Sequence, residues 1–300
     1  MELLEKADAC TLCPRRCGAT RGEGGGGYCG MPETLTVSRI SPHLWEEPPI
    51  SGVRGSGTVF FAGCNLRCVF CQNKVISHGR RGEPITEDAL VQKIWDLADR
   101  GVHNINLVTP THYTRALAKV LERVKPKLTI PVVWNSGGYE SVESLAMLEG
   151  LVDVYLPDFK FFSPESAEKY AGAKDYPEVA SRALTEMYRQ VGAVAFDQEG
   201  MMQKGVMVRH LVLPACRKDS LAVLDHLANL LPVSGIRLSL MRQYTPAFAL
   251  DTPYPNLHRT LTEFEYTSVA EEALRLGFEG FFQGKDAADP SFTPSFSCEA

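Results

Sequence analysis

Three cysteines stand close together in the first quarter of the chain, at Cys64, Cys68 and Cys71. Their C-x3-C-x2-C spacing lets three thiolates bind three irons of a cubane, whereas complete ligation of a [4Fe-4S] cluster by protein takes four thiolates. The fourth iron would keep open positions, as catalytic metal sites do. The sequence therefore predicts an iron–sulfur cluster that can bind a further molecule.

An iron with open positions can be chelated by the amino and carboxylate groups of S-adenosylmethionine (SAM). An electron from the cluster would then break the bond from the sulfonium to C5′, giving methionine and a 5′-deoxyadenosyl radical. Phe70, just before the third cysteine, would pack beside the adenine. Two other interpretations are buried structural cysteines and a zinc site, but zinc would need a fourth ligand nearby. The position of the motif directly after a predicted strand favours the cluster.

Four further cysteines lie nearer the start, at Cys10, Cys13, Cys17 and Cys29, with the spacing C-x2-C-x3-C-x11-C. Four soft ligands can close a tetrahedral zinc site or hold an auxiliary Fe–S cluster. The glycine-rich run 22–27 allows the chain to fold back before the last of them. A surface segment of free thiols is the alternative, although such thiols are easily oxidised. Zinc and an auxiliary cluster both stay open, with a preference for zinc or a structural role.

Composition narrows the class of protein. The chain has 300 residues, 44% of them hydrophobic, with 31 Lys plus Arg against 36 Asp plus Glu and a formal charge of -5. We expect no nucleic-acid partner, because a basic surface is missing, and no membrane span, because no run nears about 18 apolar residues. The acidic start does not resemble a signal peptide. These features predict a cytoplasmic protein in which seven of the nine cysteines, clustered in two groups, bind metal rather than form disulfides.

From residue 57 onward, short apolar runs alternate with amphipathic stretches. The predicted strands are 58–62, 104–108, 131–134, 152–156, 206–213 and 236–240, and the predicted helices are 86–100, 114–124, 141–148, 176–190, 220–230 and 267–276. This alternation predicts an α/β fold with a parallel sheet and right-handed connections. Six strands are too few for a closed eight-stranded barrel, so we expect a partial (β/α)6 TIM-like barrel, with a doubly wound sheet as the alternative. Two regions follow: a small, irregular, Cys-rich segment (1–56) and a core domain (57–300).

Several longer runs carry a family resemblance. They are CTLCPRRC at 10–17, WEEP at 45–48, NINLVTPTH at 104–112, YLPDFK at 155–160, VRHLVLP at 208–214 and SLMRQY at 239–244. With the C-x3-C-x2-C motif, they resemble the radical SAM activases of glycyl radical enzymes, the pyruvate formate-lyase activating enzyme group. The resemblance extends over nearly the whole chain and is strongest to the activating enzyme-like branch. It implies a partial barrel of the radical SAM type, with a [4Fe-4S] cluster and SAM as cofactors.

The resemblance also implies which side chains contact SAM. Asp158 and Lys160 match the D-x-K motif of the activases, although a salt-bridged surface pair is the alternative. Most radical SAM proteins have a Gly-Gly-Glu-like motif after the second strand, where this chain has Thr-Pro-Thr-His. The candidates to replace that motif are Thr109, Thr111 and His112.

Further candidates lie at other strand ends. Asn135 ends the third strand and could bind the ribose or the carboxylate of SAM. Arg209 and His210 alternate along the fifth strand, so only one of them can point into the barrel; for His210 a core position and a catalytic role are both open. Gln243 is a weaker polar candidate, and Cys216 is expected to be buried and inert.

Three function classes follow. In the first, the radical abstracts hydrogen from a glycine of a partner glycyl radical enzyme, with a flavodoxin- or ferredoxin-type electron donor. In the second, a radical SAM enzyme modifies a small molecule or a peptide. In the third, the protein transfers electrons or senses metal without catalysis.

Overall fold

The computed structural model describes residues 9–22, 24–284 and 296, so Cys298 lies outside the described residues. The strands are β1 (Thr36–His43), β2 (Ser56–Phe61), β3 (Glu83–Pro84), β4 (Ile105–Val108), β5 (Val132–Ser136), β6 (Val154–Pro157), β7 (Ala195–Phe196), β8 (Met202–Leu211), β9 (Arg237–Met241) and β10 (Gly280–Phe282). The helices are α1 (Pro48–Ser51), α2 (Lys74–Ser77), α3 (Glu87–Asp99), α4 (Thr114–Val124), α5 (Val142–Ala146), α6 (Pro164–Ala171), α7 (Tyr176–Val191), α8 (Arg217–Leu230) and α9 (Glu263–Arg275).

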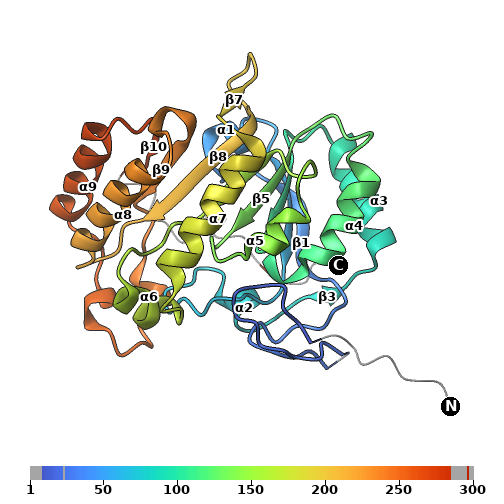
Figure 1. Ribbon diagram of the computed structural model, residues 1–300, viewed down its shortest axis with the longest axis horizontal. Coiled ribbons are helices and arrows are strands. Elements are labelled where there is room, and N and C mark those ends of the chain that lie inside the picture. Colours follow the sequence, from blue (N-terminus) through green and yellow to red (C-terminus); the bar gives the residue numbers. More distant parts are fainter. Residues whose placement is uncertain (1–8, 23, 285–295, 297–300) are drawn as a thin grey trace.

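The strands form one sheet in the order β10-β9-β8-β6-β5-β4-β2-β1-β3, with β7 paired to β8. From β2 to β10 every neighbouring pair is parallel, whereas β1 runs antiparallel to both β2 and β3. The sheet curves without closing, and helices cover its outer side (Figure 1). This arrangement confirms the predicted α/β fold and partial barrel.

The six predicted parallel strands are all present, and β10 adds a seventh at the edge beside β9. A larger difference concerns residues 1–56, which the sequence analysis treats as irregular. Residues 36–43 form β1, which pairs with β2 along six registered positions. The β-branched residues Thr36, Val37 and Ile40 fit such a half-buried strand. Residues 36–43 of this segment are therefore part of the sheet.

Local signals explain where the helices begin. The hydroxyl of Thr86 accepts from Ala89 N at 3.1 Å, as expected for the N-cap of α3. Helix α9 begins four residues before the predicted start, because Thr262 and Glu265 form a capping box. The strands that these helices cover consist almost entirely of buried residues, as parallel strands do.

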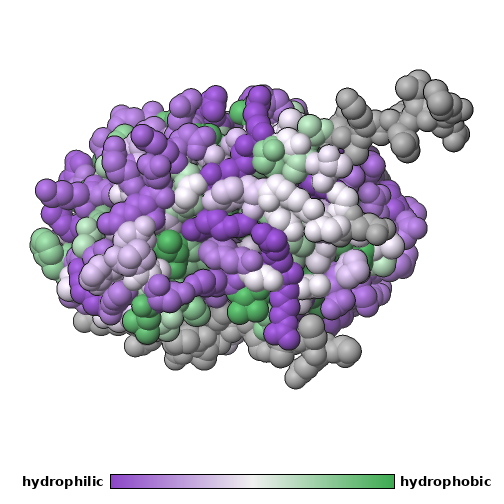
Figure 2. Space-filling view, turned by 90° about the horizontal axis from the view of Figure 1, so that it is seen from below, coloured by the Kyte–Doolittle hydropathy of each residue, from purple (hydrophilic) through white to green (hydrophobic). Residues whose placement is uncertain are grey.

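The carboxyl ends of the parallel strands meet at one edge of the sheet, the lower edge in Figure 1. The N-terminal segment and α2 lie against the same edge (Figure 1). Figure 2 looks onto this face, which is largely hydrophilic with scattered apolar groups. Among the described residues, no helix is both long and apolar enough to span a bilayer.

Candidate functional site

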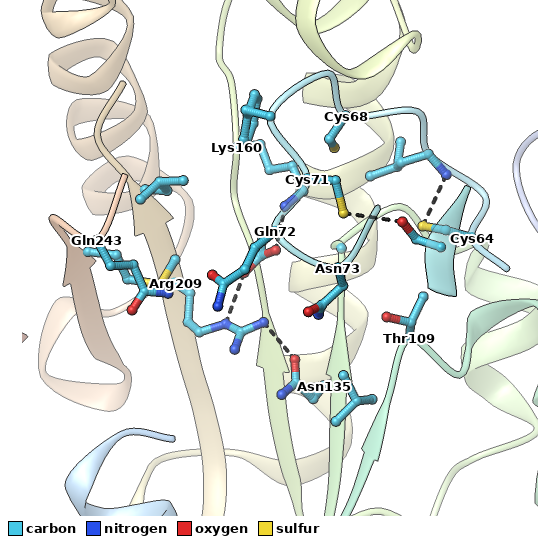
Figure 3. Close-up of a pocket in the computed structure, with 18 of the residues that line it drawn as sticks. Cys64, Cys68, Cys71, Gln72, Asn73, Thr109, Asn135, Lys160, Arg209 and Gln243 are labelled. Atoms are coloured by element: carbon cyan, nitrogen blue, oxygen red, sulfur yellow. Dashed lines mark hydrogen bonds and ion pairs between the residues drawn. The ribbon is translucent and has the colours of Figure 1, made fainter. Parts of the chain in front are cut away.

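The loop after β2 carries the three cysteines of the C-x3-C-x2-C motif. Its backbone is pinned to the end of α6, because Arg67 N donates to Ala171 O at 3.0 Å and Val69 N to Tyr170 O at 2.9 Å. Within the loop, Cys71 N donates to Cys68 O at 3.1 Å and closes a turn. The sulfur atoms of Cys64, Cys68 and Cys71 consequently face one cavity (Figure 3).

This cavity has a volume of about 240 Å³ and lies at the carboxyl edge of the sheet. Each of β4, β5, β6, β8 and β9 supplies lining residues from its carboxyl end or from the loop that follows. The polar residues that line it include Glu46, Gln72, Asn73, Thr109, Asn135, Asp158, Lys160, Arg209 and Gln243. Active sites of β/α barrels occupy this position, because side chains from several strands converge there.

The three thiols leave one ligand position of a cubane open. Burial raises the pKa of Cys64 to about 11 and that of Cys68 to about 12, so both are protonated until a metal displaces the proton. Three thiolates can bind three irons of a [4Fe-4S] cubane, whose complete ligation takes four. The open cavity beside the thiols leaves room for the fourth ligand.

A chain of alternating charges leads from the thiols into the cavity. Lys160 Nζ lies 2.5 Å from Asp158 Oδ2, and Arg209 Nε donates to Asp158 Oδ1 at 2.9 Å. Burial works against the charged carboxyl, but Arg209 and Lys160 together hold the pKa of Asp158 below its ordinary value. These side chains are only 14–18% exposed, so the alternative of a surface salt bridge does not apply.

Glu46, which belongs to the WEEP run at 45–48, is the last member of this series of charged side chains. Its carboxylate lies 3.5 Å from Arg209 Nη1 and accepts from Asn106 Nδ2 at 3.1 Å and Asn135 Nδ2 at 3.3 Å. Burial raises the pKa of Glu46 to about 7. Nothing in the sequence indicates this position, because the residue precedes α1 and enters the cavity from outside the β/α repeats.

The cavity brings together most of the candidate residues from the sequence. Phe70, Thr109, Asn135, Asp158 and Lys160 all line it with the cysteines, and Gln243 does so as well. Cys216 is partly buried, at a separate depression beside α6 and α8.

Thr111, His112 and His210 lie outside the lining of this cavity. Thr111 Oγ1 donates to buried Glu140 at 2.7 Å, and a ring nitrogen of His112 lies 2.7 Å from Ala62 O. His210 is a core residue whose Nδ1 lies 2.7 Å from Phe159 O, and burial lowers its pKa to about 4. Its neighbour Arg209 is the residue of β8 that points into the barrel, as strand alternation requires.

Thr109 has an unusual backbone conformation. Its φ is 58°, in the left-handed region that β-branched residues rarely adopt. The N–H group of Thr109 donates to Asn135 O at 2.8 Å, which fixes the turn after β4. Strain of this kind concentrates at functional sites, and here it places Thr109 on the cavity wall opposite Lys160 (Figure 3).

The N-terminal cysteine segment touches the cluster loop directly. Arg15 Nε donates to Asn65 O at 2.9 Å, and its guanidinium lies 3.8 Å from the ring centre of Tyr28. Arg67, in the cluster loop, donates to the backbone oxygens of Tyr28 and Cys64. The two cysteine groups are thus parts of one contiguous structure.

Comparison with known proteins identifies the family. A sequence model described as "Radical SAM superfamily" matches residues 58–194, which contain the cysteine motif, Thr109, Asn135, Asp158 and Lys160. The chain belongs to the radical SAM superfamily. Membership implies a [4Fe-4S] cluster and SAM as cofactors, which confirms that expectation. A curated relative, the uncharacterized protein MJ0674 of Methanocaldococcus jannaschii, is 32% identical over 282 residues, covering 90% of this chain and 75% of the relative.

Solved structures support the radical SAM fold. One is Streptococcus suis SuiB bound to precursor peptide SuiA, with a TM-score of 0.52 and 11% identity over 74% of this chain and 46% of that chain. Another is a spore photoproduct lyase variant with bound AdoMet and dinucleoside spore photoproduct, with a TM-score of 0.50 and 10% identity over 82% of this chain and 79% of that chain. The chain therefore spans less than half of the SuiB chain. At these identities the likeness concerns the fold alone.

Proposed function

We propose that this radical SAM protein binds its cluster through Cys64, Cys68 and Cys71 and generates a 5′-deoxyadenosyl radical that abstracts hydrogen from a glycine of a partner glycyl radical enzyme. The strongest support for this site assignment is the arrangement of the cavity lining. The three thiols and the Lys160–Asp158 pair line one cavity at the carboxyl edge of the strands. When bound, the cluster supplies the electron that cleaves SAM.

The protein's own residues would bind and orient SAM. Lys160, a permanent cation beside the thiols, suits a carboxylate, while Asp158 suits an ammonium group or a ribose hydroxyl. Asn135 adds an amide whose oxygen already accepts from Arg209 at 2.6 Å. Phe70, packed edge-on against Phe161, offers an apolar ring for the adenine. Gly137 lines the same cavity without a side chain, beside Leu66 and Lys160.

SAM cleavage tests the first part of this proposal. Anoxically reconstituted protein treated with dithionite should release 5′-deoxyadenosine and methionine from SAM. Cys68→Ala should abolish this release, while Cys216→Ala, which alters a cysteine outside the cavity, should not. Reconstituted protein with full iron content and no 5′-deoxyadenosine would contradict catalysis and favour electron transfer or metal sensing.

The substrate needs a second experiment. A candidate partner enzyme, incubated with the reduced protein and SAM, should develop the electron paramagnetic resonance doublet of a glycyl radical. An electron donor of the flavodoxin or ferredoxin type should replace dithionite. SAM cleavage without a glycyl signal in any candidate partner would contradict the activase assignment. Modification of a peptide or a small molecule would then be the better assignment, and the fold shared with a peptide-bound enzyme makes a peptide the first to try.

A further inference from the structure

The four cysteines of the N-terminal segment have no part in the function proposed above. Two backbone hydrogen bonds, from Cys10 N to Ala19 O at 3.1 Å and from Gly18 N to Cys10 O at 3.2 Å, close a loop that contains Cys13 and Cys17. Within it, Arg16 N donates to Cys13 O at 3.0 Å and forms a tight turn. Three of the thiols therefore belong to one closed loop.

The fourth cysteine returns to the same place. A second turn, closed by Gly30 N to Gly27 O at 3.2 Å, contains Cys29. This turn packs against the first loop so closely that a Cβ on Gly27 would lie 2.5 Å from Cys17 Sγ. Gly26, whose carbonyl oxygen lies 3.9 Å from Cys29 Sγ, packs closely against Ala19 and Thr20 at the end of the first loop. Residues about 20 positions apart in the sequence thus converge.

The segment lacks the usual means of holding such a shape. Residues 10–22 and 24–30 contain no helix or strand, and their cysteines are free thiols. Of the four, only Cys13 and Cys29 are buried. Small irregular segments with little apolar core are ordinarily fixed by disulfides or by a metal. A reduced segment of this composition points to a metal.

Tight turns follow two of the four cysteines. Cys17 and Cys29 are each followed by a glycine with positive φ, 64° at Gly18 and 71° at Gly30. Glycine adopts this conformation without strain, so the chain can turn sharply beside each of these thiols.

We propose that Cys10, Cys13, Cys17 and Cys29 bind one Zn²⁺, and that this closed site braces the cluster loop. Four thiolates are the ligand set of structural zinc, and they leave no position open for substrate. Because the described thiols do not yet converge to ion-binding distances, their side chains must rotate as the metal binds. The brace runs through Arg15 to Asn65 O and through Tyr28 to Arg67.

Metal analysis of the full chain tests the site directly. Anoxically purified protein should contain about one zinc and about four iron atoms per chain. Cys13→Ser and Cys17→Ser should each lose the zinc, whereas Cys216→Ser should keep it. About eight irons without zinc would overturn the choice of zinc in favour of an auxiliary cluster. No metal beyond the irons of the first cluster would overturn the site itself.

A spectroscopic measurement guards against variants that merely misfold. Co²⁺ added to metal-free protein carrying Cys64→Ala, Cys68→Ala and Cys71→Ala should give the thiolate charge-transfer and d–d bands of a tetrahedral site. Cys17→Ser in that background should weaken the charge-transfer band, and unchanged bands would overturn the ligand assignment. Because this protein has no cluster ligands, the result is independent of SAM cleavage.

The brace has its own readout. Removing zinc from the intact protein with a chelator should increase hydrogen exchange at the amides of Arg67 and Val69, which the cluster loop donates to residues 170–171. Exchange in α9, which packs against α8 at the other end of the sheet (Figure 1), should stay the same. Equal exchange of the loop amides with and without zinc would overturn the bracing role.

Discussion

Arg209 and Asp158 form a bridge across the cavity, with 2.9 Å between the guanidinium Nε and the carboxylate Oδ1. The two residues come from neighbouring strands of the sheet, β8 and the end of β6. The second oxygen of Asp158 accepts from Lys160. One carboxylate therefore orients two cations, and the position of both depends on its charge.

Replacing that carboxylate should be costly. Asp158→Asn keeps the size of the side chain but leaves buried Lys160 without its counterion and leaves Arg209 with only the more distant Glu46, at 3.5 Å. Removing one partner of a buried ion pair costs about 3–5 kcal/mol, and SAM affinity should fall as well. Chemical denaturation and calorimetric SAM titration measure the two effects. Glu178→Gln, which alters an exposed pair with Arg182, should change stability by less than about 0.5 kcal/mol. Equal effects of the two substitutions would contradict the role of Asp158.

The backbone at Gly138, which packs against Asp158, is equally constrained. Gly138 has a φ of 74°, and an added Cβ would lie 2.1 Å from Asp158 O. Gly150 has a nearly identical φ of 77°, but a Cβ there would meet no atom within 4 Å. Gly150→Ala should therefore cost only the left-handed strain of about 1–2 kcal/mol, whereas Gly138→Ala should cost more and also weaken SAM binding. Thermal unfolding and SAM titration of both variants provide the comparison. Similar losses would mean that the contact with Asp158 is relieved cheaply.

The strands and the cluster cysteines could be predicted from the sequence because each is indicated by a local pattern. The apolar runs of β4, β5 and β6 and the C-x3-C-x2-C spacing are each contained within a dozen residues. Strand alternation limited the choice to Arg209 or His210, but only the packed structure assigns Arg209 to the cavity. The role of Glu46 could not be predicted, because its position in the cavity depends on how β1 and α1 fold onto the sheet. Thr111 and His112 became candidates through comparison with the Gly-Gly-Glu-like motif. In the structure they form hydrogen bonds with Glu140 and with the backbone of Ala62, outside the cavity lining.

The protonation of Glu46 should make stability depend on pH. Its pKa is raised from 4.5 to about 7 in the folded protein, so between these values the folded state binds more protons than the unfolded state. The free energy of unfolding must then fall as pH rises through this window. The Glu46→Gln variant cannot ionise at this position and should lack this pH dependence. As pH rises from 4.5 to about 7, its free energy of unfolding should therefore gain about 1–3 kcal/mol relative to that of the original protein. Denaturation across this range measures the difference, and a constant difference would contradict the raised pKa.

Arg15 and Arg16 are adjacent but should differ sharply in their effect on the cluster loop. Arg15 donates to Asn65 O and stacks on Tyr28, so Arg15→Ala removes a hydrogen bond and a cation–π contact worth about 1–2 kcal/mol together. Arg16 makes a 3.5 Å ion pair with Glu143 in which both side chains are mostly exposed, so Arg16→Ala should be nearly neutral. The measurement is the rate at which an iron chelator removes the cluster from anoxic, reconstituted protein. Arg15→Ala should speed iron loss severalfold because the loop opens more often, whereas equal rates for the two variants would show that the N-terminal segment does not hold the loop closed.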